Sequence, residues 1–165
     1  MQEFVYQLIE DNTYCVIGYR GDEANVVIPE RVNGAPITVL FDRLFRGHTE
    51  ITSIKIPETV TDLGEFVFDG CKNLRHIELP SQLARLWGHS FAGCGIEEIA
   101  LPDKLTLFPP FAFKDCKNLK KVICGAGMKQ ICAWVFGGCD QLTEVVHGPN
   151  VEISPEAFHT KKLNT

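Results

Sequence analysis

Cysteine and histidine are the residues of this chain best suited to nucleophilic or metal chemistry, and its 165 residues include seven cysteines and five histidines. One pair stands out, because Cys124 and His147 lie 23 residues apart at matching positions of a pattern described below. A closed zinc site needs four ligands. We find no Cys-x-x-Cys, His-Glu-x-x-His or phosphate-cradling glycine motif. We therefore expect a packed Cys-His pair and predict no catalytic residue, metal or cofactor; a Cys-His nucleophile is the alternative.

Four other cysteines occupy one repeated position, three residues after a phenylalanine. They are Cys71, Cys94, Cys116 and Cys139. An odd cysteine count prevents complete internal pairing. Successive coils of a β-solenoid lie about 4.8 Å apart, a spacing that also allows disulfides between coils. We expect reduced thiols instead, because a buried free cysteine packs as a small apolar residue in a tight turn.

The elements that hold these residues come from an internal repeat. A phenylalanine recurs as Phe45, Phe68, Phe91, Phe113, Phe136 and Phe158, with steps of 23, 23, 22, 23 and 22 residues. That period predicts a solenoid, in which each coil buries its apolar side chains against its neighbours. We predict a single domain over residues 1–165, with an N-terminal β-hairpin cap at 1–25 and about six coils at 26–165.

The clearest copy of the repeat covers residues 68–80. It reads Phe-x-x-Cys-x-x-Leu-x-x-Ile-x-Leu-Pro. This pattern resembles the BspA-like leucine-rich repeat family (type 5 repeats of about 23 residues). The resemblance implies an α/β fold: a curved right-handed leucine-rich-repeat solenoid, mostly β with short helical turns, and a parallel sheet on its concave face. It also implies an adhesive or protein-binding role at a bacterial cell surface. The chain departs from the pattern at Gly125 and Gly148, which replace the proline, and at His48 and Lys161, which replace the cysteine.

Charge and composition exclude two classes of partner. The net charge is -5, and the lysines and arginines are scattered, so we expect no nucleic acid partner. No apolar run approaches the roughly 18 residues of a membrane helix, so we expect no membrane insertion. The first residues form neither a basic leader nor an apolar signal segment. The chain as it stands therefore suggests a cytoplasmic protein or a trimmed chain, whereas the resemblance implies a secreted or surface protein; the localisation stays unknown.

A second repeated position lies two residues before each phenylalanine and is rich in aromatic residues. It holds Arg43, Phe66, His89, Phe111, Trp134 and Glu156, and Trp87 lies close by in the sequence. We expect Phe66, Trp87, His89, Phe111 and Trp134 to form an exposed aromatic edge on the convex side. Such an edge suits a protein partner, a sugar ring or a second copy of the chain. The alternative is that the rings only shield the coil beneath them.

The outward side chains of the first strand in each coil form further columns. One runs Lys55, Glu78, Ala100, Ile123 and Val146 and turns from charged to apolar. We expect Ala100, Ile123 and Val146 to form a contact on the concave sheet; shielding near the chain end is the alternative. Two columns alternate in sign, Arg75-Glu97-Lys120 and Glu98-Lys121-Glu144, and predict ion pairs between coils. Lys161 and Lys162 are expected to keep the last strand edge from pairing with another chain.

Taken together, these patterns predict a non-catalytic protein-protein interaction or adhesion module, with an unidentified protein partner or self-association. A carbohydrate-binding surface is the second hypothesis. An enzyme is the third, because no acid-base pair or nucleophile stands out from the repeat.

Overall fold

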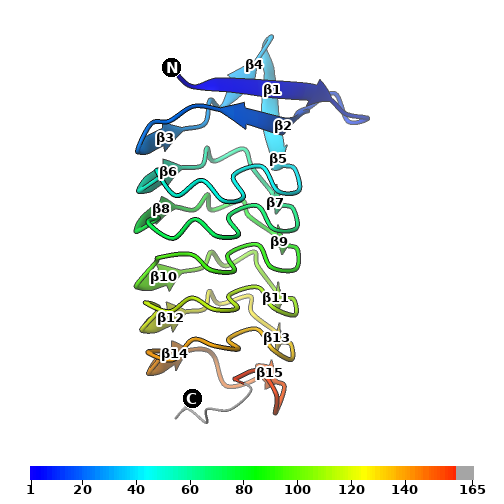
Figure 1. Ribbon diagram of the computed structural model, residues 1–165. Coiled ribbons are helices and arrows are strands. Elements are labelled where there is room, and N and C mark those ends of the chain that lie inside the picture. The colour runs from blue at the N-terminus through cyan, green and yellow to red at the C-terminus, as the bar shows by residue number, and fades with distance from the viewer. Residues whose placement is uncertain (159–165) are drawn as a thin grey trace.

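The computed structural model describes residues 1–158, which form a β-solenoid of about six coils. Each coil contributes two short strands, and the strands of successive coils lie above one another (Figure 1). The first strands of the coils form two parallel sheets of three strands each. These sheets are β3 (Asn25–Val27), β6 (Ser53–Lys55) and β8 (His76–Glu78), then β10 (Glu98–Ala100), β12 (Lys121–Ile123) and β14 (Glu144–Val146).

The second strands form a matching pair of sheets. The upper sheet continues from the N-terminal hairpin through β5 (Ala35–Leu40), β7 (Asp62–Leu63) and β9 (Arg85–Leu86). The lower sheet contains β11 (Leu107–Phe108), β13 (Gln130–Ile131) and β15 (Glu152–Ile153). Both sets of sheets are therefore interrupted at the same joint, between the coil of β8 and β9 and the coil of β10 and β11.

Two local features of the sequence coincide with this joint. Only one residue separates Cys94 from the next apolar residue, Ile96, whereas two residues separate Cys71 from Leu74. The chain therefore reaches β10 by a shorter path. Pro109 follows β11 and has no backbone N–H to donate to the coil above. The turns still join the two halves, because the N–H groups of Phe91 and Gly93 donate to carbonyl oxygens of the next coil at 2.9 and 2.8 Å.

An antiparallel hairpin precedes the coils, where the sequence predicted one. It pairs β1 (Glu3–Leu8) with β2 (Tyr14–Arg20), and β2 then pairs in parallel with β5. A further short strand, β4 (Arg31–Val32), folds back on β5. The Tyr19 ring packs on Phe45 with 5.1 Å between ring centroids, so the hairpin covers the first phenylalanine of the core.

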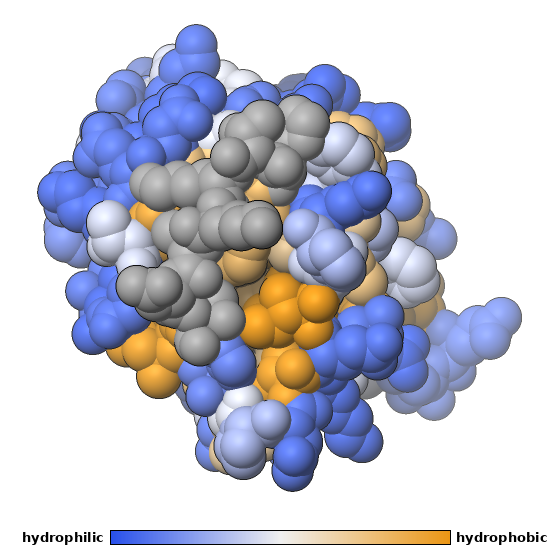
Figure 2. Space-filling model, turned by 90° about the horizontal axis from the view of Figure 1, so that it is seen from below, coloured by the Kyte–Doolittle hydropathy of each residue, from blue (hydrophilic) through white to orange (hydrophobic). Residues whose placement is uncertain are grey.

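The phenylalanines of the repeat form a single file along the solenoid, as predicted. Successive rings from Phe45 to Phe158 stack with centroid separations of 5.2–5.7 Å. Phe68, Phe91 and Phe113 are completely buried. Seen from the C-terminal end, hydrophobic residues gather near the middle and hydrophilic residues around the rim (Figure 2). The repeat thus places its largest apolar side chain on the axis of the stack.

The expectation of short helical turns is wrong: the described residues contain no helix. The reason lies in the backbone hydrogen bonds of the turn that ends each coil. Phe66, Phe68 and Gly70 donate their N–H groups to the next coil, at 2.8–3.2 Å, so only the residues between them are free to bond within the turn. A helix needs every N–H for its own ladder. In the same part of the chain, no segment forms a helix that could cross a membrane.

Candidate interaction surface

Four aromatic side chains form a stacked column on the surface, which we call the aromatic column: Phe66, His89, Phe111 and Trp134. Phe66 and His89 lie 4.4 Å apart between ring centroids, and His89 and Phe111 lie 4.8 Å apart, with interplanar angles of 12° and 14°. The Phe111 and Trp134 rings are offset at 6.5 Å and 18°. All four side chains are half-buried. The rings therefore cover one another's faces and present their edges to solvent.

The backbone under the column is left-handed at every rung. The φ angles of Phe66, His89, Phe111 and Trp134 lie between 57° and 66°, and Arg43 above them has a φ of 62°. Glycine or asparagine adopts this region most readily, and a bulky side chain there is an outlier. The turn places the side chain outward, which is why a position so close to the core phenylalanine carries a surface ring.

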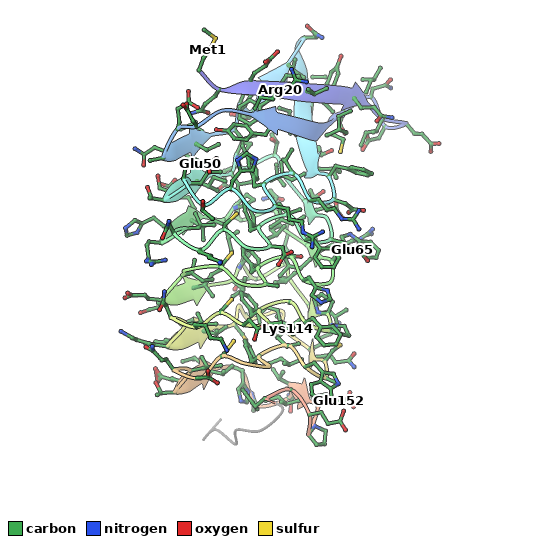
Figure 3. All side chains as sticks on the ribbon, in the orientation of Figure 1. Met1, Arg20, Glu50, Glu65, Lys114 and Glu152 are labelled. Atoms are coloured by element: carbon green, nitrogen blue, oxygen red, sulfur yellow. The ribbon has the colours of Figure 1, made fainter. Side chains whose placement is uncertain are left out.

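Positive charges lie over the faces that the column leaves accessible. The guanidinium carbons of Arg43 and Arg46 are 5.5 and 5.0 Å from the centroid of the Phe66 ring. Lys114, labelled in Figure 3, places its Nζ atom 5.7 Å from the centroid of Phe111. These distances are within the range of cation–π attraction. The column is thus an apolar strip bordered by cations.

Histidine is neutral in this strip at physiological pH. Burial, and next the positive charge of Lys114, lower the pKa of His89 below its ordinary value. A neutral imidazole stacks between Phe66 and Phe111 without the cost of burying a charge. The four stacked rings themselves therefore carry no charge at pH 7, and the charges lie on the cations that border them.

A hollow of about 450 Å³ opens beside the lower half of the column. Phe111 and Trp134 line it together with Lys114, Asp115 and the glycine pair at 137–138. A ligand bound in this hollow would therefore contact Phe111 and Trp134 together.

Trp87 does not belong to the column, contrary to its grouping with those rings in the sequence. It lines another hollow, of about 390 Å³, together with Phe41. Phe41 was missed by the sequence reasoning, although it stands four residues before Phe45 as Trp87 stands four before Phe91. That shared repeat position was the signal that could have found it.

Ala100, Ile123 and Val146 lie in register on β10, β12 and β14. Ala100 and Val146 are exposed and Ile123 is half-buried. On the upper sheet of the same side, Lys55 and Glu78 occupy the matching positions and form an ion pair of 3.7 Å. The predicted change from charged to apolar side chains is present along this column. Its role as a contact stays a prediction.

The charge columns follow the prediction in part. Lys121 and Glu144 form an ion pair of 3.3 Å between β12 and β14. Arg75 behaves differently, because its Nη1 atom donates to the carbonyl oxygens of Lys72 and Gly95, both at 2.8 Å. It thus joins two coils at the joint where the sheets are interrupted. The expectation for Lys161 and Lys162 lies outside the described residues.

Neither ring nitrogen of His147 bonds to the Cys124 thiol within the described residues. The Nδ1 atom of His147 lies 2.7 Å from the carbonyl oxygen of Gly148, and Nε2 is buried without a hydrogen-bond partner in the described residues. Burial raises the pKa of the Cys124 thiol to about 11, which disfavours the thiolate. No group of three or more potential metal ligands occurs among residues 1–158. The two residues follow β12 and β14 at matching positions of adjacent coils, and their packing against each other stays a prediction.

All seven cysteines are free thiols. In the repeated position, each thiol donates to the carbonyl oxygen of the phenylalanine one coil earlier. The bonds are Cys71 to Phe45 (3.0 Å), Cys94 to Phe68 (3.2 Å), Cys116 to Phe91 (3.0 Å) and Cys139 to Phe113 (3.0 Å). These cysteines therefore join coils through hydrogen bonds.

Comparison with known proteins agrees with this geometry. A family model described as "BspA type Leucine rich repeat region" matches residues 38–164 in six copies. The structure is similar to the crystal structure of a leucine-rich repeat protein from T. pallidum (TpLRR), with a TM-score of 0.74 and 27% identity over 91% of this chain and 82% of that one.

A leucine-rich repeat protein from Bacteroides ovatus is also similar, with a TM-score of 0.67 and 26% identity over 94% of this chain. This chain spans 49% of that protein's length. One from Bacteroides capillosus shares the fold, with a TM-score of 0.64 and 22% identity over 73% of this chain and 93% of that one. No curated protein matches the chain.

Proposed function

The chain belongs to the BspA type leucine-rich repeat family, and from that premise we propose that it is a non-catalytic module that binds another protein through the aromatic column. The stacking of Phe66, His89, Phe111 and Trp134 on the surface is the observation that carries this proposal. Aromatic side chains held rigidly at a surface give a large contact area at little cost in conformational entropy.

The left-handed backbone at these four positions favours a use for the side chains beyond covering the coil. A left-handed φ costs about 1–2 kcal/mol in a residue other than glycine, and the chain accepts that cost at four successive aromatic positions. Glycine would satisfy the turn without strain. Stacking adds about 0.5–1.5 kcal/mol per pair to the free energy of burying the rings, and the backbone strain offsets much of that gain.

The sheet formed by β10, β12 and β14 is a second candidate contact of the same module. Its apolar column of Ala100, Ile123 and Val146 is continuous over three coils. Adhesion at a cell surface would be one use of such a module, in keeping with the family.

Carbohydrate binding is less well supported than protein binding. Sugars stack on an open ring face, whereas Phe66, His89 and Phe111 cover one another's faces. The hollow lined by Phe111 and Trp134 is the place in residues 1–158 where a sugar would meet the rings of the column. A glycan-array signal that is lost in Trp134→Ser would favour a sugar over a protein.

The test uses Phe111→Gly, because glycine removes the ring and fits the left-handed turn. Relief of backbone strain offsets part of the stacking and burial that the ring supplies, and chemical denaturation of each variant confirms that it is folded. Proteins from an extract are captured on immobilised protein, and each candidate is then purified and its affinity measured directly. The proposal expects a partner that binds the natural chain and Val27→Ser equally but binds Phe111→Gly at least about tenfold more weakly.

Val27 is the matched control because it is an exposed apolar residue outside the column, on β3. Equal affinity of every purified partner for Phe111→Gly and for the natural chain would overturn the proposal. Sedimentation velocity of the same three proteins tests self-association, and dimers lost only in Phe111→Gly would identify a second copy as the partner.

A further inference from the structure

Phe41 and Trp87 stand on either side of an empty rung, and we name this pair the aromatic clamp. Leu40, Leu63 and Leu86 are in register on β5, β7 and β9, so the next residues, Phe41, Gly64 and Trp87, follow at matching positions. Both rings are 51% exposed. Gly64 between them has no side chain, and the rings line one hollow of about 390 Å³.

The glycine keeps the clamp open for a structural reason. A Cβ atom at Gly64 would lie 2.7 Å from the backbone nitrogen of Asp42, which is closer than real Cβ contacts allow. The rung between the two rings therefore stays without a side chain. Rungs lie about 4.8 Å apart, so the backbones of Phe41 and Trp87 are about 10 Å apart across it. A planar group held midway between two rings at this spacing would lie about 5 Å from each, within cation–π distance of both.

Carboxylates surround the clamp. Asp42, Asp62 and Glu65 line the same hollow, and none of its lining residues is a lysine or arginine. Glu65, labelled in Figure 3, projects at the side of the solenoid that carries β7 and β9. Two of the carboxylates are held in place: Asp42 Oδ1 accepts the N–H of Glu65 at 2.9 Å, and Asp62 Oδ2 accepts the hydroxyl of Thr61 at 2.6 Å.

Little positive charge neutralises this site. Arg85 lies 3.9 Å from Asp62, at the outer limit of an ion pair, and the side chain of Glu65 makes no ion pair in the described residues. Three carboxylates around two exposed rings disfavour an apolar or anionic ligand, since it would bring uncompensated charge out of water. A cation gains attraction from the rings and from the carboxylates together.

We propose that the aromatic clamp binds an arginine side chain of a partner protein, with the guanidinium between Phe41 and Trp87 and its N–H groups directed at Asp42 and Glu65. Guanidinium is planar, stacks on aromatic faces and bonds carboxylates through a fork of donors, which a lysine ammonium does not match. No residue of the aromatic column lines this hollow. The site is therefore an additional contact, and its failure leaves the proposed function standing.

The clamp can be observed directly because the chain has two tryptophans, Trp87 and Trp134. Protein labelled with 5-fluorotryptophan gives two ¹⁹F resonances, which Trp87→Phe assigns. The probes are the peptides acetyl-Gly-Arg-Gly-amide, its lysine counterpart and its citrulline counterpart, which has the shape of arginine without the charge. Single exposed contacts of this kind are weak, so titrations reach concentrations of about 10 mM.

The expected result is a saturable shift of the Trp87 resonance with the arginine peptide, a weaker one with lysine and none with citrulline. Phe41→Ala and Glu65→Gln should each weaken binding by roughly fivefold, and Val27→Ala should have no effect. Added salt should weaken binding as well. Thermal unfolding of each variant confirms that it is folded.

Three outcomes would overturn the assignment. Equal shifts with arginine and citrulline would show that charge is not recognised. Equal affinity for lysine and arginine would show a cation site without preference for guanidinium. An undiminished shift of Trp87 in folded Phe41→Ala would show that the two rings do not act together.

Discussion

The thiol of Cys71 donates a hydrogen bond to the carbonyl oxygen of Phe45, 3.0 Å away in the preceding coil. The same carbonyl oxygen also accepts a hydrogen bond from the N–H of His48 at 3.1 Å. The thiol therefore donates to the second lone pair of that oxygen. Three further cysteines repeat this contact down the solenoid. The cysteine of the motif is thus a buried donor that joins one coil to the next, and its acceptor is the backbone carbonyl of a core phenylalanine.

Cys94→Ala should lower the free energy of unfolding by about 1–2 kcal/mol, because it removes the second donor to the Phe68 carbonyl and leaves a small void. Cys94→Ser keeps a donor and should cost less. Urea unfolding measures both. Equal losses for alanine and serine would mean that the hydrogen bond contributes nothing beyond packing.

Stability should fall as the pH rises above about 9. Burial raises the pKa of the Cys71 thiol from 9.0 to about 12, so between these values the unfolded chain has released a proton that the folded chain still holds. Each such thiol lowers the free energy of unfolding by about 1.4 kcal/mol per pH unit. Urea unfolding at several pH values measures the slope. In Cys71→Ala the slope should be shallower by that amount, and an unchanged slope would contradict the assignment.

Thiol reagents should modify the folded protein slowly at pH 8. Burial raises the pKa of Cys15 and of Cys124 to about 11, so about one thiol in a thousand is ionised at that pH. Cys132 is half-buried and its pKa is raised less far, so it should be labelled first, as mass spectrometry of digested protein would show. Faster labelling of Cys124 than of Cys132 would support the nucleophile hypothesis instead.

Phe91→Ala should cost about 3–5 kcal/mol. Its ring is fully buried between Phe68 and Phe113, at 5.4 and 5.2 Å. Phe158→Ala is the matched control, because that ring is only half-buried and should cost less. Chemical denaturation compares the two. A similar cost at both positions would contradict a core built from neighbouring coils.

Arg75→Met should cost about 1–3 kcal/mol, because the carbonyl oxygens of Lys72 and Gly95 lose a charged donor at the interrupted joint. Lys120→Met is the control, since Lys120 occupies the same repeat column and is exposed. Hydrogen exchange should show the loss of protection in the turns on either side of the joint. An equal, small effect of both substitutions would mean that Arg75 is an ordinary surface cation.

The sequence by itself determined the features that repeat. A chain that returns to the same place every 22 or 23 residues brings identical positions into register. The file from Phe45 to Phe158, the column of Ala100, Ile123 and Val146, and the pairing of Lys121 with Glu144 therefore followed from spacing alone. The N-terminal hairpin was visible from its β-rich runs and the turn between them.

Only the tertiary structure decided what happens where the backbone leaves that register. The spacing of the repeat specifies neither the sign of φ nor the acceptor of each N–H group. It therefore could not test the helical turns that the family resemblance implied, and alternate N–H groups in fact bond to the next coil. For the same reason Trp87 was grouped with the aromatic column although it lines a hollow with Phe41, and Arg75 was assigned to a charged column although it bridges two carbonyl groups. Such contacts depend on the conformation of one particular turn, and the period of the repeat does not specify that conformation.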